Sequence, residues 1–482
     1  MSTAPEIVVV GGGLAGMAAA LSCADSGARV TLVEKRARLG GLTWSFTHDG
    51  LTMDNGQHVF LRCCTAYLDF LDRVGSAGDV HVQGRLDVAV VRDGRTAVLR
   101  RDRLRAPLHL ARSLLSYSLV PWAERARIGL AAAALARLDL DDPGLDEETF
   151  EHWLVRHHQG PAAISHLWEL ICLATVNLPA SRASLAMAAK VFQTGLLTDA
   201  SAGDIGWSTV PLGQLHGARG EAALAKAGVA VHKGEQVQAV APLHPTGPGD
   251  AGAGEAGAGE AGGGGTARYV VRTATGELTA DAVVVALPHY CVEDVLPAGA
   301  LHSKPARLGS SPIVNVHVHF DRKVTDLAFA AGDGVAQWVF DRTQSSGAGR
   351  GQYLAVSVSG ADDYIGARRD QLESGAVEAL GRMFPGVAQA RVLSSLVTRE
   401  HHATFRAEPG SSAHREPPRS RLRGLALAGA WTATGWPPTM EGAVRSGLAG
   451  ARAALAATRT SGPGSQPAPG RRTQPATVQE AQ

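Results

Sequence analysis

Ile7–Gly41 reads IVVVGGGLAGMAAALSCADSGARVTLVEKRARLGG, and this stretch decides the fold. Its first residues, Ile7–Val10, form an apolar, β-branched run that is typical of a parallel strand buried on both faces. A G-x-G-x-x-G motif follows, at Gly11, Gly13 and Gly16. The first glycine permits a tight turn, the second lets the backbone approach a pyrophosphate, and the third lets a helix pack closely on the strand. A helix beginning near Leu14 would point its positive N-terminal end at that pyrophosphate.

A second strand and an acidic residue complete the unit. Arg29–Val33 has the pattern of a strand, and Glu34 follows directly. A carboxylate at this point can accept both ribose hydroxyls of an adenine nucleotide and would repel a 2′-phosphate. The alternative is a glycine-rich turn without a ligand. Because strand, helix, strand and acid are in register, the stretch favours a βαβ unit that binds an adenine dinucleotide.

Composition limits the class of protein. The 482 residues are 45% hydrophobic and 19% charged, which indicates a folded chain long enough for two cores. The net charge of +1 gives no electrostatic reason to expect a nucleic-acid partner. Five cysteines without C-x-x-C spacing favour neither a disulfide framework nor a zinc site, so we expect no metal and a cytoplasmic location. Neither a signal peptide nor an apolar run of about 20 residues is recognisable, which leaves a protein in solution or on the inner face of a membrane.

Two further motifs lie far apart in the chain. Leu51–Phe60, LTMDNGQHVF, predicts a strand that enters a turn, with the polar residues 54–58 at its tip. Leu422–Ala457 contains TATGWPPTMEGAVRSG, a loop that leads into a helix beginning near Met440.

Together, the βαβ start, Glu34, the Gly40-Gly41 pair and DNGQH resemble the FAD-dependent amine oxidase and phytoene desaturase superfamily. Within it, DNGQH and the TATGWPPTMEGAVRSG segment are most similar to the hydroxysqualene dehydroxylases, squalene-associated flavoenzymes of bacterial hopanoid pathways. One departure matters. The family commonly has Gly-Asp directly before the tryptophan at position 431, and this aspartate binds a ribitol hydroxyl of FAD, whereas this chain has Gly429-Ala430.

The resemblance implies an α/β fold: a Rossmann-like, glutathione-reductase-type FAD-binding domain with an interleaved α+β substrate domain that contains an antiparallel sheet and lid helices. The FAD domain is expected at 1–75, 205–300 and 415–458, and the substrate domain at 76–204 and 301–414. Low-complexity composition predicts a disordered insertion at 244–266 and a disordered tail at 459–482.

The resemblance also implies the FAD contacts. These are expected at Gly11, Gly13, Leu14, Ala15, Gly16, Glu34, Lys35, Gly40, Gly41, Leu42, Asn55, Gly56, Gln57, His58, Val237, Gly429, Ala430, Met440 and Glu441. The Gly-Gly pair would let a loop run close to the ribitol and the flavin, and Val237 would lie beside the adenine end, with a plain core valine as the alternative.

The implied reaction replaces the allylic C–OH of hydroxysqualene, a C30 isoprenoid, by C–H to give squalene, with an unidentified electron donor to the FAD. Candidate general acids are His58 and Glu441. His58 is favoured because an unperturbed histidine titrates near neutral pH; its alternative is to brace the turn. Glu441 lies in the first turn of its helix, where the helix dipole favours a carboxylate in any case.

Three other functions stay open: a carotenoid desaturase, which runs the flavin oxidatively; an amine oxidase, which needs an aromatic cage; and a prenyl-binding escort protein without flavin. The intact G-x-G-x-x-G motif with Glu34 argues against the last.

Two segments have two interpretations each. Arg101–Leu138 is helical in pattern and rich in leucine and arginine, which suits either docking on anionic lipid or lid helices with snorkelling arginines. In Ile313–Phe320, IVNVHVHF, alternation places Asn315, His317 and His319 on one face, which we expect to be solvated rather than ligating.

Overall fold

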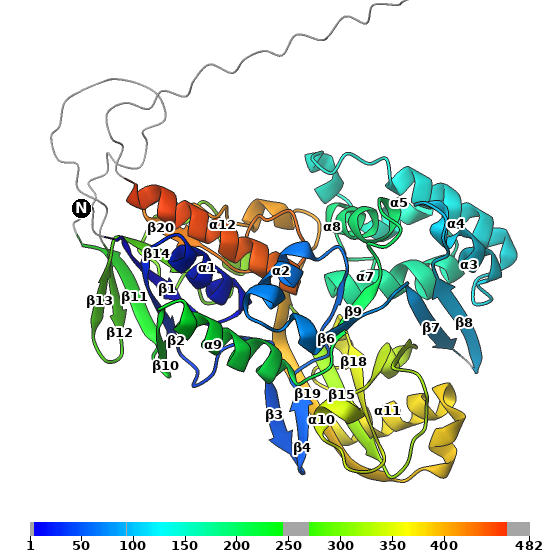
Figure 1. Ribbon diagram of the computed structural model, residues 1–482. Helices are drawn as coiled ribbons and strands as arrows, with labels where there is room; N and C mark the ends of the chain where they lie inside the picture. Colours follow the sequence, from blue (N-terminus) through cyan, green and yellow to red (C-terminus); the bar gives the residue numbers. More distant parts are fainter. Residues whose placement is uncertain (1–3, 93, 244–268, 460–482) are drawn as a thin grey trace, which may run out of the picture.

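The structure is a computed structural model that describes residues 4–92, 94–243 and 269–459. One unit is built around a parallel sheet, and the second around a larger sheet with a group of helices beside it (Figure 1). The insertion expected at 244–266 and residues 460–482 of the expected tail lie outside the described residues.

The parallel sheet has five strands from distant parts of the chain. Their order is β10 (Ala230–Lys233), β2 (Arg29–Glu34), β1 (Glu6–Val10), β14 (Ala282–Val285) and β20 (Leu425–Leu427). Val9 and Val284 are fully buried on one face, and Val8 and Val283 are buried on the other. Such strands need cover on both faces.

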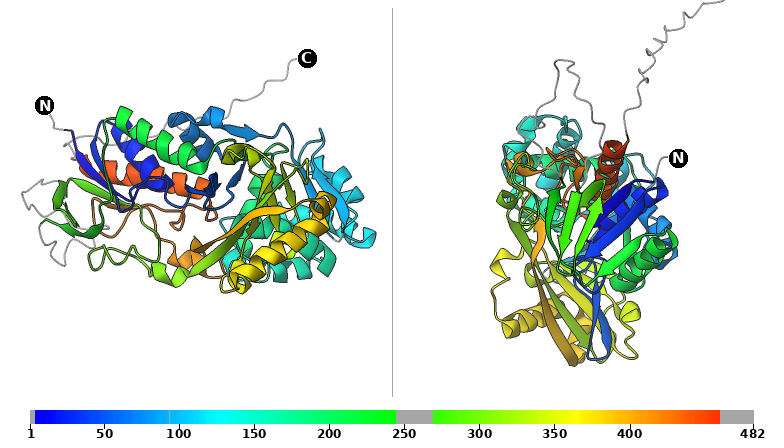
Figure 2. Two further views of the ribbon diagram at one scale, coloured as in Figure 1. Left: turned by 90° about the horizontal axis from the view of Figure 1, so that it is seen from below. Right: turned by 90° about the vertical axis from the view of Figure 1, so that its left-hand side faces the viewer.

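Helices cover one face of this sheet and a small sheet covers the other. The helices are α1 (Leu14–Asp25), α9 (Arg219–Lys226) and α12 (Met440–Thr458). The small antiparallel sheet consists of β11 (Val237–Pro242), β12 (Tyr269–Thr273) and β13 (Glu277–Ala280). α1 and α12 run beside each other across the sheet (Figure 2). This α/β arrangement confirms the expected fold class.

The larger sheet has seven strands. Their order is β19 (Val392–Phe405), β15 (Ser310–Phe320), β18 (Gln352–Val358), β17 (Trp338–Asp341), β16 (Phe329–Ala331), β7 (Asp87–Arg92) and β8 (Arg95–Arg100). All neighbours are antiparallel except β16 and β7, which pair in parallel. α11 (Arg369–Met383) packs on one face.

A hairpin from the first half of the chain packs on the opposite face. It consists of β3 (Ser45–His48) and β4 (Leu51–Asp54). Leu51 and Met53 form a small apolar cluster with Tyr353 and Ala355 of β18. The hairpin therefore joins the two units next to the DNGQH turn.

The remaining helices gather beside β7 and β8 (Figure 1). Buried aromatic side chains of Phe150, Trp153 and Trp168 form the centre of this group. The helices are α3 (Ala111–Ser116), α4 (Trp122–Leu135), α5 (Phe150–Arg156), α6 (Pro161–Ala163), α7 (Glu169–Val176) and α8 (Leu185–Phe192). Of the other elements, α2 (Thr65–Arg73) packs against α12, and α10 (Thr343–Ser346) packs against β18 and β4. A three-stranded sheet is formed by β5 (Val59–Leu61), β9 (Ile205–Ser208) and β6 (Val80–Val82).

The environment of β15 differs from the expectation. Asn315 and His317 are buried, with 1% and 0% exposure, so the prediction of a solvated strand face is wrong there. The reason is the β3–β4 hairpin, whose Phe46 ring packs edge-on against the His317 ring. His317 Nδ1 hydrogen-bonds to the Tyr353 hydroxyl at 2.6 Å.

Two buried histidines should make stability depend on pH. Burial lowers the pKa of His317 to about 4 and that of His216 to about 3. In the unfolded chain both histidines titrate near pH 6.5. Below that pH the unfolded state therefore binds protons that the folded state excludes, and the stability of the folded state decreases as the pH is lowered. We expect the free energy of unfolding in urea to fall by about 2.5 kcal/mol between about pH 6 and pH 5 from this pair.

Variants separate this effect from other titrations. His317→Gln should halve the pH-dependent loss attributed to the pair, whereas His152→Gln, which changes an exposed histidine on α5, should leave it unchanged. An unfolding free energy that is constant over this pH interval would contradict the prediction.

Candidate functional site

A cavity of about 480 Å³ lies where the two units meet. One wall comes from the turn after β1, the end of β2 and the N-terminus of α12. The opposite wall comes from β15, β18 and β19, and residues of α7 contribute as well. The space extends from the carboxyl edge of the parallel sheet, where nucleotides bind in open α/β sheets, to the larger sheet.

The glycine motif shapes one end of this cavity. Gly11 has φ +102°, and a Cβ there would lie 2.5 Å from the Ala286 carbonyl oxygen. A Cβ at Gly16 would lie 1.8 Å from the Gly11 oxygen, so this glycine serves close packing of α1 on β1. A Cβ at Gly13 would meet nothing closer than 3.8 Å, so the backbone there faces open space at the helix N-terminus. This division of roles is that of a pyrophosphate cradle.

Glu34 is held in place by backbone groups. Its Oε2 accepts a hydrogen bond from the Gly12 N–H at 2.6 Å, and its Oε1 accepts one from the Arg36 N–H at 2.8 Å. The residue lines the cavity and is 8% exposed. Each carboxylate oxygen retains a lone pair, so the fixed carboxylate can still accept two ribose hydroxyls.

The loop before α12 forms the middle of the cavity. Gly429, Ala430 and Met440 line it, and Ala430 presents no carboxylate. Arg415 is buried against this loop and is 7% exposed. Its guanidinium donates hydrogen bonds to the Thr432 carbonyl oxygen at 2.6 Å and to the Trp436 carbonyl oxygen at 2.8 Å. Burial lowers the pKa of Arg415 to about 10, so it stays charged at neutral pH.

The DNGQH turn is fastened to the larger sheet. The Asn55 carbonyl accepts hydrogen bonds from Asn315 Nδ2 at 3.1 Å and from Thr398 Oγ1 at 3.3 Å. Gln57 Nε2 is buried without a hydrogen-bonding partner among the described residues. Both Gln57 and Asn55 line the cavity, so an unpaired donor is available to a bound group.

His58 lines the same cavity. Burial lowers its pKa; the charge of Asp54 opposes this shift and that of Arg342 adds to it. Asp54 itself is a structural residue: its Oδ2 accepts a hydrogen bond from Arg342 Nη2 at 3.0 Å, and its Oδ1 accepts one from the Leu212 N–H at 2.9 Å.

Glu441 does not line the cavity. Its carboxylate accepts hydrogen bonds from the N–H groups of Ala66, at 3.2 Å, and Tyr67, at 2.7 Å, in the first turn of α2. Arg445 Nε donates to the same carboxylate at 2.6 Å. Glu441 therefore caps the N-terminus of α2, and Arg445 balances its negative charge. The expectation that Glu441 is a candidate general acid is corrected accordingly.

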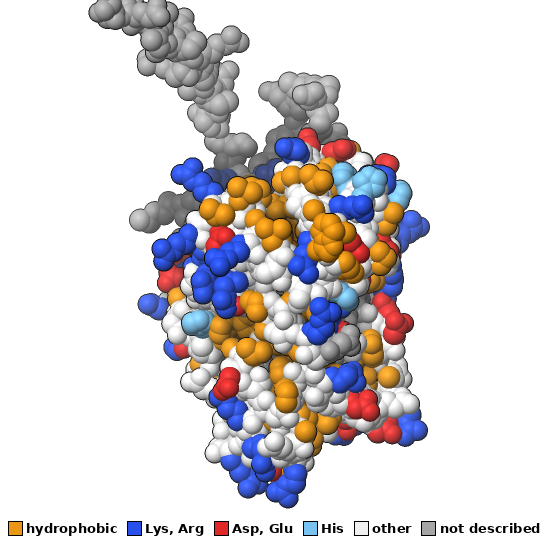
Figure 3. All heavy atoms as spheres, turned by 90° about the vertical axis from the view of Figure 1, so that its right-hand side faces the viewer, with side chains coloured by type: hydrophobic (Ala, Val, Ile, Leu, Met, Phe, Trp, Pro, Cys, Tyr) orange, Lys and Arg blue, Asp and Glu red, His pale blue; other side chains and the backbone are white. Residues whose placement is uncertain are grey.

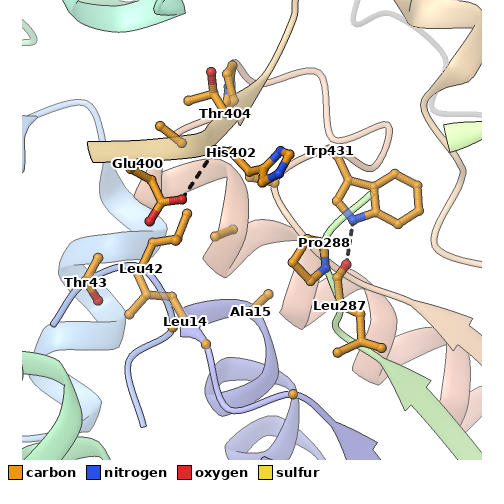
Figure 4. Close-up of a pocket in the computed structure, with 18 of the residues that line it drawn as sticks. Leu14, Ala15, Leu42, Thr43, Leu287, Pro288, Glu400, His402, Thr404 and Trp431 are labelled. Atoms are coloured by element: carbon orange, nitrogen blue, oxygen red, sulfur yellow. Dashed lines mark hydrogen bonds between the residues drawn. The ribbon is translucent and has the colours of Figure 1, made fainter. Parts of the chain in front are cut away.

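The wall formed by β19 supplies side chains that the sequence analysis did not select. Glu400, His402 and Thr404 lie on the cavity side of this strand, opposite Leu14 and Ala15 of α1 (Figure 4). Glu400 Oε2 accepts a hydrogen bond from Asn55 Nδ2 at 3.4 Å. The sequence did contain a signal for these residues. In a strand, side chains alternate between the two faces, so VTREHHATF places these three polar residues on the same face.

Most of the expected cofactor residues therefore come together. Those that line the cavity are Gly11, Gly13, Leu14, Ala15, Glu34, Lys35, Gly40, Gly41, Leu42, Asn55, Gly56, Gln57, His58, Val237, Gly429, Ala430 and Met440. Gly16 and Glu441 lie behind it and act through packing and capping. In the described ranges, no group of three histidine, cysteine, aspartate or glutamate side chains could hold a metal ion.

The residues fit an adenine dinucleotide with a flavin. The evidence is the open Gly13 backbone at the helix N-terminus, the fixed Glu34 carboxylate and the unpaired Gln57 donor, all on one cavity.

Comparisons with known proteins agree with this geometry. The model of the flavin containing amine oxidoreductase family matches residues 14–455. A hydroxysqualene dehydroxylase of Sinorhizobium fredii is 32% identical over 186 residues, which cover 37% of this chain and only 40% of that protein. A zeta-carotene desaturase of Synechocystis is 24% identical over 490 residues, which cover 94% of this chain and 97% of that protein.

Among solved structures, the cyclohexylamine oxidase of Brevibacterium oxydans superposes with a TM-score of 0.65. The match covers 94% of this chain and 99% of that one, at 18% sequence identity. At this identity the similarity concerns the fold alone.

Proposed function

This chain belongs to the flavin containing amine oxidoreductase family, and from that premise we propose that it is an FAD-dependent hydroxysqualene dehydroxylase. The reaction removes the allylic hydroxyl of a C30 isoprenoid and yields squalene. The observation that carries the proposal is the DNGQH turn, which brings His58 and Gln57 onto the cavity wall and is shared in pattern with the dehydroxylases. The 32% identity to the Sinorhizobium fredii enzyme supports it.

The reaction needs two transfers, a proton to the leaving hydroxyl and a hydride to the carbon that carried it. The substrate hydroxyl leaves as water once it has been protonated, and an allylic cation remains at the carbon. A bound reduced flavin supplies the hydride that converts this carbon to C–H. The protein must hold the substrate carbon against the flavin, deliver the proton and keep other water away from the cation.

The chain offers one group for the proton and one for the charge that develops when the hydroxyl leaves. His58 is our choice for the acid, because it lines the cavity and neither ring nitrogen is hydrogen-bonded to another described residue. Glu400 lies on the facing sheet, connected to the same turn through Asn55. We assign Glu400 the role of stabilising the positive charge that develops when the hydroxyl leaves.

A carotenoid desaturase is the second candidate. The specific observation in its favour is the match to the Synechocystis zeta-carotene desaturase, which extends over nearly the full length of both chains. The two functions differ in the direction of hydride transfer. A desaturase passes hydride from the substrate to oxidised flavin and needs no acid for a leaving hydroxyl.

Incubation with substrates tests the proposal. The flavin-loaded protein, reduced with dithionite under anaerobic conditions, should convert hydroxysqualene to squalene with one flavin oxidised for each squalene formed. The oxidised protein with a quinone acceptor should leave phytoene and zeta-carotene unchanged. Desaturated carotenoid without any squalene would establish the second candidate instead, and neither product would contradict both.

His58→Gln tests the acid. We expect the single-turnover rate of squalene formation to fall by about 100-fold, within the usual range for removal of a general acid. Since burial lowers the pKa of His58, the wild-type rate should rise as the pH is lowered toward that pKa, and the variant should lack this rise.

His152→Gln on α5 is the control and should keep both the rate and the pH profile. Flavin content should be equal in all three proteins. A His58→Gln variant with the wild-type pH profile would assign the proton to another group.

A further inference from the structure

One face of the helical group exposes an unusual amount of apolar surface. Among the described residues, every large hydrophobic side chain that is more than half exposed lies between positions 104 and 155. These are Leu104, Leu108, Leu115, Trp122, Leu130 and Val155, and Trp122 is the most exposed at 80%. Figure 3 looks onto this side of the molecule, where apolar and basic side chains alternate over the surface.

The local structure explains why these residues are not buried. Residues 101–107 form a loop rather than the expected helix, and Pro121 separates α3 from α4. In α4 the buried residues are Ile128, Ala131 and Leu135, which leaves Trp122 and Leu130 on the outward side.

Unpaired basic groups surround these side chains. Arg103, Arg105, Arg112 and Arg127 are exposed, and none of them has an acidic partner among the residues that the structure describes. The stretch 101–138 contains seven arginines and two acidic residues, a net charge of +5, whereas the whole chain has +1. Positive charge is therefore concentrated on this face.

We propose that the surface formed by Leu104, Leu108, Leu115, Trp122 and Leu130 with Arg103, Arg105, Arg112 and Arg127, hereafter the docking face, binds the surface of an anionic lipid bilayer. The apolar side chains enter the boundary between headgroups and acyl chains, and the arginines contact lipid phosphates. Trp122 suits this position because its ring is apolar with one polar N–H.

Charge decides between a bilayer and a second copy of the chain. In a two-fold dimer the same patch meets itself, so the four exposed arginines of one copy would be opposed to the same four of the other. An anionic bilayer instead neutralises the arginines. None of the helices in the described ranges is long and apolar enough to cross a bilayer, and the docking face requires only contact with one leaflet. The proposal is independent of the substrate assigned above.

Vesicle co-sedimentation of the flavin-loaded chain tests this proposal. Binding is expected with vesicles of phosphatidylcholine and phosphatidylglycerol and should be weaker with phosphatidylcholine alone or at high salt. The triple variant Arg103→Gln, Arg112→Gln and Arg127→Gln should bind the anionic vesicles about 100-fold more weakly, since each basic group near such a surface contributes a factor of about five.

The matched control removes the same charge from the flavin-binding unit. Its substitutions are Arg29→Gln, Arg219→Gln and Arg272→Gln, on exposed side chains. The control should bind as the wild type does. Equal loss in both triple variants, wild-type affinity in the docking-face variant, or a wild type that does not bind anionic vesicles would each overturn the proposal.

A variant without its apolar groups adds a second readout. Leu115→Ser with Trp122→Ser alters only exposed positions and should reduce binding to anionic vesicles without lowering thermal stability. If the wild type instead sediments as a dimer that this variant abolishes, the face is an interface between copies and the proposal fails.

Discussion

Replacement of Gly447 by alanine is expected to lower the free energy of unfolding by about 3 kcal/mol and the affinity for flavin by about 150-fold, at the upper end of the usual cost of overpacking. Gly447 lies in α12 where this helix crosses α1. An added Cβ would lie 2.1 Å from the Ala15 carbonyl oxygen, and backbone at such a distance has to move.

The flavin site would follow that movement. Ala15 lines the cavity at the N-terminus of α1, and Met440 lines it at the N-terminus of α12. The neighbouring Ser446 Oγ accepts a hydrogen bond from the Gly429 N–H at 2.8 Å, so the loop before α12 depends on the same contact. Forcing the helices apart therefore misplaces both helix termini that face the cofactor.

Gly129→Ala provides the comparison for Gly447→Ala. Gly129 is also inside a helix, α4, but a Cβ there would meet no atom within 4 Å, so alanine should be neutral or stabilise by about 0.5–1 kcal/mol. Denaturant unfolding and flavin content measured by absorbance give both quantities. Equal behaviour of the two variants would show that the α1–α12 crossing has no such role.

Arg415→Lys is expected to have an effect of similar size, about 4 kcal/mol in stability and at least a 100-fold loss of flavin affinity. The guanidinium of Arg415 bonds several groups of one loop at once: Nη2 donates to the oxygens of Thr432 and Trp436, and Nε donates to the Trp431 oxygen at 3.3 Å. An ammonium lacks the planar fork that reaches all of them, so buried carbonyls lose their partners.

The loop that would lose this support carries Gly429, Ala430 and Trp431 to the cavity. The hydrogen bonds from Arg415 to the carbonyl oxygens of Trp431, Thr432 and Trp436 maintain the path of this loop. Arg419→Lys, at an exposed position of the same segment, should change neither stability nor flavin content. Calorimetric titration of the apoprotein with FAD would measure the difference; equal affinities for both variants would contradict this role.

The flavin-binding start of the chain could be predicted from sequence because its signals are local. The β-branched run, the three glycines and Glu34 each act within about thirty residues, and the structure places β1, α1 and β2 where this pattern predicted them. Glycine at position 16 is required by a contact with Gly11, five residues away in the same turn.

Errors arose where the deciding contact comes from a distant segment. His317 looks like a solvated strand residue until the β3–β4 hairpin covers it. Glu441 looks like a residue of the flavin site until α2 is found to place two N–H groups on its carboxylate. Neither contact has a signature within its own strand or helix.

The amino-acid sequence by itself determined the βαβ unit, the family and most of the residues that line the cavity on the side of the parallel sheet, because turn geometry and hydrophobic period depend on near neighbours in the chain. Only the tertiary structure decided that β19 brings Glu400 and His402 to the cavity, that Arg415 supports the loop before α12 and that the docking face stays uncovered. The physical reason is that burial, an unpaired charge and a shared cavity are properties of surfaces meeting in space, and these surfaces come from segments up to several hundred residues apart.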